Sequence, residues 1–237
     1  MLCIEKEIPR ENLKHIPFVH ADGSPRFQPI PHHVLADSIV NETNKIGLSI
    51  KSERWGIAHD DASLFGEIVL DESGVYQNPK DMEFTIGIRA NNNKRFPVTL
   101  VSGTNVFVCS NMIIFGDFFL KKRHTIGLDL ESEINSGLQN VLNSRPLLLD
   151  CVDEMKNTVV SEYRANDLMM KSAQTGLVSY SHLKEVHKEW KQPSYSDFNS
   201  RTEWSLYNCF NEVMKKYNPI RQQSSVGVYP VSPKWTI

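Results

Sequence analysis

Residues 89–125 read RANNNKRFPVTLVSGTNVFVCSNMIIFGDFFLKKRHT, and this stretch decides the fold. Apolar and β-branched runs alternate with groups of turn residues at 91–94 and 103–105, which is typical of consecutive antiparallel strands. Asparagine tolerates the left-handed backbone angles that tight turns require, so the first group predicts a strong turn. The expected strands lie at 96–101, 106–109 and 112–120, with a break at Ser110-Asn111.

The residues before this stretch predict one helix and three more strands. Pro31 suits the first turn of a helix, and Gly47 suits its end. Residues 83–90 alternate apolar and polar side chains, which indicates a strand with one exposed face. The other expected strands are 55–59 and 64–70, joined by a turn at Asp60-Asp61.

The residues after Thr125 place apolar side chains at helical spacing, so this half of the chain is expected to be helical. A run of strands followed by a run of helices predicts an α+β fold, namely an antiparallel sheet meander preceded by one helix and followed by a helical half. We expect residues 1–237 to form a single domain, because helices are needed to cover one face of the sheet. Its parts are an N-terminal arm at 1–30, helix plus sheet at 31–125, the helical half at 126–218 and an irregular tail at 219–237.

The overall charge restricts how this chain can bind a polyanion. It has 237 residues and a formal net charge of −2, so nucleic acid would have to be bound by a local basic surface. The N-terminus carries charges where a secretion signal needs an apolar run, and no apolar stretch reaches the roughly 20 residues of a membrane-spanning helix. We therefore expect a cytoplasmic protein without a membrane partner.

Residues 89–125 provide such a local basic surface, because cationic and asparagine side chains gather at the strand ends. Lysine and arginine attract phosphates, and the release of condensed counterions supplies affinity. Asparagines beside them are able to bond base edges or sugars. The candidate nucleic-acid-binding residues are Arg89, Asn91, Asn93, Lys94, Arg95, Lys121, Arg123 and His124. The alternative is that the cations of the hairpin tip only keep it soluble and protect the sheet edge from aggregation.

Sequence motifs for common enzymes are missing. The chain holds no P-loop, GxGxxG, GxSxG or HExxH motif, so no catalytic residue is assigned. Its histidines and carboxylates miss the spacing of known metal sites, and we expect no metal and no cofactor. An enzyme of unrecognised type stays open as a third hypothesis, with Asn111, Arg123 and His124 around one pocket.

Short motifs that follow one another along the chain carry a family resemblance. They are Arg89-Ala90-Asn91, Gly103, Val106-Phe107-Val108-Cys109-Ser110-Asn111, Arg123-His124-Thr125 and Thr202-Glu203-Trp204-Ser205-Leu206-Tyr207-Asn208, with Pro29-Ile30-Pro31 before the first helix. Over residues 29–218 the sequence resembles a phage- and plasmid-associated family of conserved proteins of unknown function. The resemblance implies a viral or mobile-element origin, hence the cytoplasm of a host cell, and no established reaction. At 91–95 the chain departs from the family pattern, because cationic residues replace an acidic one.

Two functions from different classes follow from these observations. The first is a phage-encoded accessory protein that binds nucleic acid, with single-stranded DNA favoured, in replication, recombination or DNA protection. The outline of its fold is similar to that of phage single-strand-annealing recombinases. The second is a non-catalytic protein–protein module that inhibits a host defence or host metabolic protein. Self-association into a homo-oligomer is compatible with both, because sheet edges and an apolar C-terminal helix would serve as interfaces.

Overall fold

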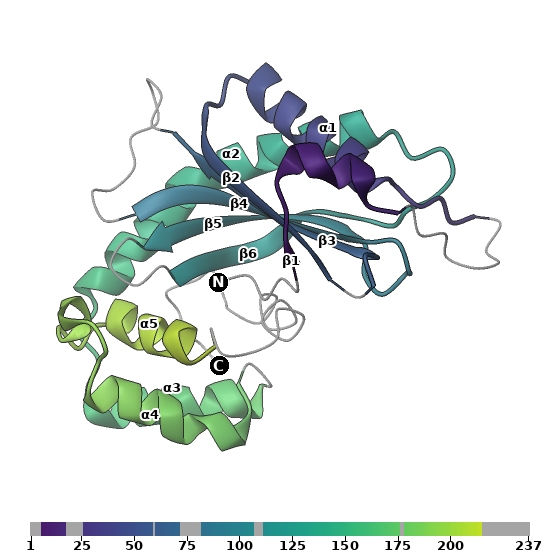
Figure 1. Cartoon of the computed structure of the whole chain (residues 1–237). Helices are drawn as coiled ribbons and strands as arrows, with labels where there is room; N and C mark the ends of the chain where they lie inside the picture. Colours follow the sequence, from purple (N-terminus) through teal and green to yellow (C-terminus); the bar gives the residue numbers. More distant parts are fainter. Residues whose placement is uncertain are drawn as a thin grey trace. The chain divides into compact units, whose positions relative to one another are not determined.

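The structure, a computed structural model, confirms the predicted α+β fold. It describes residues 6–17, 26–58, 60–71, 82–106, 111–175 and 178–214, and the side chains of 102 and 104–119 lie outside the description. The chain divides into two compact units (Figure 1). The sheet unit holds the described residues between 6 and 104 and between 118 and 143, and the helical unit holds those between 105 and 117 and from 144 onwards. The expected single domain stays a prediction.

An antiparallel sheet of six strands in meander order contains five of the predicted strands and one more. The bounds are β1 Lys6–Glu7, β2 Ile50–Ala58, β3 Ser63–Leu70, β4 Met82–Asn91, β5 Val98–Val106 and β6 Asn111–Lys122. The short strand β1 lies in the segment that was predicted to be an N-terminal arm. Asp60 and Asp61 form the predicted turn between β2 and β3, with φ angles of 54° and 62°.

The central strands differ from the prediction in their burial. β4 pairs with β3 from Val69↔Thr85 to Ser63↔Asn91, and Thr85 and Gly87 are buried together with Phe84 and Ile86. The predicted exposed face of residues 83–90 is therefore wrong, since the strand is covered on both sides. Alternation in the sequence shows which side chains share a face and does not show what covers that face.

The predicted turn at Gly103-Thr104-Asn105 is also wrong, because β5 continues through these residues to Val106. Hydrogen-bonded neighbours on both sides of β5 outweigh the local turn preference of glycine and asparagine. Residues 107–110, which include most of the strand expected at 106–109, lie outside the described residues.

Two helices of the sheet unit pack next to each other, and their buried side chains join the core of this unit (Figure 1). Helix α1, His32–Lys45, starts after Pro31 and ends before Gly47, whose φ of 82° suits glycine, as predicted. Helix α2, Leu130–Asn157, is continuous through Pro146, and its first half belongs to the sheet unit. The Asn135 amide on α2 donates to the Glu42 carboxylate on α1 at 3.0 Å.

The helical unit has a core of its own. Beyond the second half of α2 it contains α3 Glu162–Gln174, η2 Tyr180–His182, α4 Leu183–Lys191, η3 Ser196–Phe198 and α5 Glu203–Met214. Ser161 caps α3 by accepting a hydrogen bond from the Arg164 backbone N–H. Trp190, Phe210 and Leu168 are central to its apolar cluster. No helix in the described part of the chain is long and apolar enough to cross a membrane.

Candidate nucleic-acid interface

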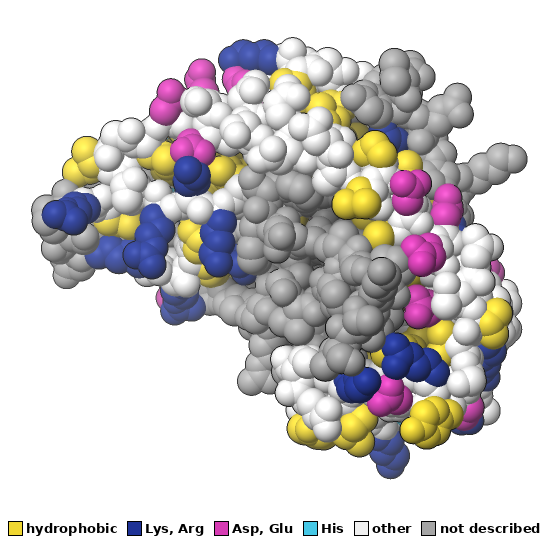
Figure 2. Space-filling model, turned by 180° about the vertical axis from the view of Figure 1, so that it is seen from behind, with side chains coloured by type: hydrophobic (Ala, Val, Ile, Leu, Met, Phe, Trp, Pro, Cys, Tyr) yellow, Lys and Arg dark blue, Asp and Glu magenta, His cyan; other side chains and the backbone are white. Residues whose placement is uncertain are grey.

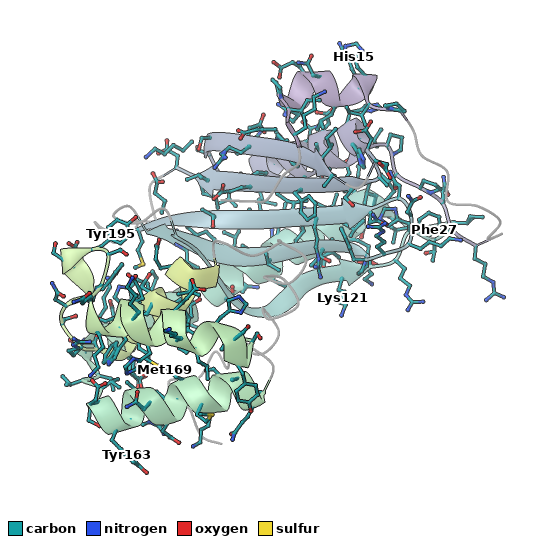
Figure 3. All side chains as sticks on the ribbon, turned by 60° about the horizontal axis from the view of Figure 1, so that its bottom comes forward. His15, Phe27, Lys121, Tyr163, Met169 and Tyr195 are labelled. Carbon is teal, nitrogen blue, oxygen red and sulfur yellow. The ribbon has the colours of Figure 1, made fainter. Side chains whose placement is uncertain are left out.

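One end of the sheet collects most of the cations that the sequence singled out. The antiparallel order places the turn that follows β4 beside the start of β5 and the end of β6. The candidate cations that are exposed there are Lys94, Arg95, Lys121 and Arg123, and we name them the basic end. Figure 2 shows lysine and arginine side chains gathered over this part of the sheet unit. Figure 3 shows Phe27 and Lys121 toward the same end of the sheet.

The turn after β4 is built by the side chain of Asn91. Its Oδ1 accepts hydrogen bonds from the backbone N–H groups of Asn93 and Arg95, both at 2.8 Å. Its Nδ2 donates to the Ser63 hydroxyl at 2.8 Å, on the neighbouring strand β3. These bonds hold the loop against the sheet, and the side chains of Lys94 and Arg95 extend from it into solvent.

The exposed tip is shorter than the predicted segment from Asn91 to Arg95. Asn91 is completely buried and Asn92 almost so, which leaves Asn93, Lys94 and Arg95 at the surface. A left-handed backbone occurs at Lys94, with φ of 63°, and not at an asparagine. Asparagine favours this turn through its side-chain hydrogen bonds, so Asn91 is placed to shape the loop rather than to touch a ligand.

Arg89 lies one pleat before the turn and is half-buried. Its guanidinium carbon lies 5.2 Å from the centre of the Phe96 ring, and its Nε donates to the Thr99 hydroxyl at 3.4 Å. Burial lowers the pKa of this guanidinium. Arg89 is therefore engaged in packing at the edge of the basic end, unlike the predicted exposed contact.

His124 is buried and stacks on Phe27. The two rings are 5.3 Å apart with an angle of 10° between their planes, and 1% of His124 is exposed. Neither ring nitrogen has a hydrogen-bond partner among the described residues. Burial, followed by the nearby His32, lowers the pKa of His124 to about 4. An uncharged, buried imidazole packs against Phe27 and offers nothing to a phosphate, so the structure removes His124 from the contact surface.

Acidic side chains border the basic end. The β2–β3 turn carries Asp60 and Asp61 at the same end of the sheet, which confines the cationic surface to the side of β4 to β6. Lys122 pairs with Glu133 at 2.7 Å. Within the described residues, Arg95 and Arg123 have no salt-bridge partner.

The enzyme hypothesis grouped Asn111 with Arg123 and His124 around one pocket. Asn111 is the first residue of β6, and Arg123 follows its last residue. The described residues also contain no cluster of three metal-ligating side chains.

Two residues near the basic end were missed in the sequence, Asn92 and Phe27. The Asn92 amide bonds the backbone of Ile30. Phe27 contacts both His124 and Lys94, whose Nζ is 5.4 Å from the ring centre. The run Asn91-Asn92-Asn93 was a usable signal, because three amides in one turn exceed what the turn alone requires. The partners of Phe27 are distant in the chain, so no local pattern indicates them.

Comparisons with known proteins leave the origin of the chain open. No protein-family model, no curated protein and no solved structure matches it. The resemblance to the phage- and plasmid-associated family therefore stays a prediction.

Proposed function

We propose that the basic end binds the phosphate backbone of nucleic acid, with single-stranded DNA as the favoured ligand. The observation that carries the proposal is the grouping of Lys94, Arg95, Lys121 and Arg123 as exposed cations at one end of the sheet. Contacts of this kind supply affinity through counterion release and do not depend on base sequence. An accessory role in replication, recombination or DNA protection requires such sequence-independent binding.

Fluorescence anisotropy with a labelled oligo-dT at several salt concentrations tests the proposal. Each neutralised phosphate on a single strand contributes about 0.7 to the slope of log affinity against log salt, so four cations predict a slope of about −3. The variant Arg95→Ala/Arg123→Ala is expected to reduce this slope by about 1.4 and to weaken binding at low salt by about tenfold. The matched control is Lys184→Ala/Lys188→Ala, which removes two exposed lysines of α4.

Two results would refute nucleic-acid binding at this surface. One is wild-type affinity that does not change with salt. The other is an equal loss of affinity in the basic-end variant and in the α4 control. A labelled duplex of the same composition, measured in parallel, tests the preference for single strands.

The second candidate, a protein–protein module, is favoured by exposed apolar side chains of the helical unit. Tyr163 is 85% exposed, and Met170 lies seven residues later on the same face of α3. Large exposed apolar groups on one face are typical of interaction sites. Capture of one host protein that Tyr163→Arg abolishes and the basic-end substitutions leave intact would support this function over the first.

A further inference from the structure

A segment of the N-terminal region adds a further cation to the basic end. We name residues 26–30 the strap, and its first residue, Arg26, is exposed. We propose that Arg26 belongs to the phosphate-binding surface and that Asn92 is the positioning residue that holds the strap, and with it Arg26, beside Lys94 and Arg95. This inference rests on the nucleic-acid binding proposed above.

The strap is paired with the segment that follows β6. Phe27 and Thr125 form an antiparallel bridge. The Gln28 backbone N–H donates to the carbonyl of His124 at 3.1 Å, and the Ile126 N–H donates to the carbonyl of Arg26 at 3.1 Å. Arg26 is thus fixed opposite residues that follow directly after Arg123 in the chain.

The other end of the strap is held by the side chain of Asn92. Its Oδ1 accepts from the Ile30 backbone N–H at 3.0 Å, and its Nδ2 donates to the Ile30 carbonyl at 2.9 Å. The amide therefore replaces the partner strand that these two backbone groups would otherwise need. The backbone N–H of Asn92 donates to the carbonyl of Ala62 at 2.8 Å, so one residue joins the strap, the basic loop and the start of β3.

The strap also contributes packing to the loop. Phe27 stacks on His124, and the ammonium of Lys94 lies over its ring. The ammonium of Lys94 thus lies over the residue that follows Arg26 in the chain, although Lys94 and Arg26 are distant in sequence. Cations on backbone that the fold already holds in place bind a ligand at a lower cost in conformational entropy. The contact surface is then made of two chain segments that Asn92 joins.

A double-mutant cycle on the salt slope tests both parts of the inference. The proteins are the full-length wild type, Arg26→Ala, Asn92→Ala and the double variant, with oligo-dT as the probe. Arg26→Ala is expected to reduce the slope by about 0.7, the value of one phosphate contact. Asn92→Ala is expected to reduce it by part of this amount, because the strap is released at Ile30 and Arg26 keeps only the backbone bonds around Thr125. The double variant then resembles Arg26→Ala, which is the non-additivity of coupled residues.

The outcomes separate the inference from the function on which it rests. Wild-type protein that lacks salt-dependent binding refutes the function itself. Salt-dependent wild-type binding with an unchanged slope in Arg26→Ala overturns the inference alone. Slope reductions that add in the double variant overturn the positioning role of Asn92, since a purely structural residue has no specific coupling to Arg26. Should Asn92→Ala fail to fold, Phe27→Leu loosens the strap by a second route and enters the same cycle.

Discussion

Among the cations that lie over aromatic rings, Lys94 and Arg201 have opposite surroundings. Lys94 lies 5.4 Å from the ring centre of Phe27 at the basic end, and Arg201 lies 4.6 Å from that of Trp190 in the helical unit. Both residues have left-handed backbones, with φ of 63° and 55°. The local motif is thus the same in the two units.

The difference lies in what else each cation contacts. Arg201 donates hydrogen bonds to the backbone carbonyls of Trp190 and Lys191, and Trp190 is completely buried. The guanidinium of Arg201 is therefore bonded within the helical unit. Lys94 is exposed on a loop that Asn91 shapes, so its charge faces solvent. A basic residue over an aromatic ring indicates a binding surface only when the structure leaves its charge accessible.

The largest expected effect tests whether the aromatic ring of the helical unit is structural. Trp190→Ala should lower the free energy of unfolding by about 4 kcal/mol, because a buried tryptophan leaves a large cavity. Its indole also donates to the Glu162 carboxylate at 3.2 Å. Chemical denaturation measures the change, with Tyr163→Ala as an exposed control expected within about 0.5 kcal/mol of wild type. A larger loss of unfolding free energy in Phe27→Ala than in Trp190→Ala would contradict the distinction between the two rings.

The second prediction uses the imidazole beneath Phe27. The pKa of His124 is lowered to about 4 from its ordinary 6.5, so between these values the unfolded chain binds more protons than the folded one. The free energy of unfolding should therefore fall as pH drops from 6.5 to 4, by about 3 kcal/mol. Burial also lowers the pKa of the neighbouring His32, which adds a loss in the same direction.

Denaturation at a series of pH values measures this effect, with His124→Phe as the control. Phenylalanine preserves an aromatic stack on Phe27 and cannot take up a proton. Its unfolding free energy should depend less on pH between 6.5 and 4 than that of wild type. Equal pH dependence in the two proteins would show that His124 is not the responsible group.

The third prediction compares the cost of the left-handed backbone at residue 201 with the stabilisation from the contacts of Arg201. Glycine relieves the left-handed backbone at residue 201, and Arg201→Gly also removes two hydrogen bonds and the contact with Trp190. Each such hydrogen bond contributes about 1 kcal/mol, the contact with the Trp190 ring contributes about 1 kcal/mol, and the relief of strain returns about 1 kcal/mol. We expect a net loss of about 2 kcal/mol in denaturation experiments. Stabilisation by this substitution would mean that the contacts of Arg201 contribute little.

The sequence predicted the sheet and the helices because hydrophobic periodicity depends on neighbours along the chain. Turn residues at 60–61 and at Gly47 were equally local and were placed correctly. The errors arose where residues distant in the chain determine the local structure. Gly103 to Asn105 stay in β5 because this strand pairs with adjacent strands. At the candidate site, exposed lysines and arginines were found from composition. The structural roles of Asn91 and His124 were not predicted, because segments distant in the chain bury both side chains.

The smallest expected effect concerns Lys94 of the basic end and tests its comparison with Arg201 directly. Lys94→Gly relieves the left-handed backbone without losing a buried contact, so unfolding should become harder by up to about 1 kcal/mol. The same change removes an exposed cation, and the salt slope for oligo-dT should decrease by about 0.7. Stability and affinity then change in opposite directions, as expected of a residue kept for binding. The control Lys94→Asn tolerates the same backbone without the charge and should behave alike. If Lys94→Gly lowers the free energy of unfolding as Arg201→Gly does, both cations stabilise the fold. That result would contradict the proposal that the basic end binds phosphate.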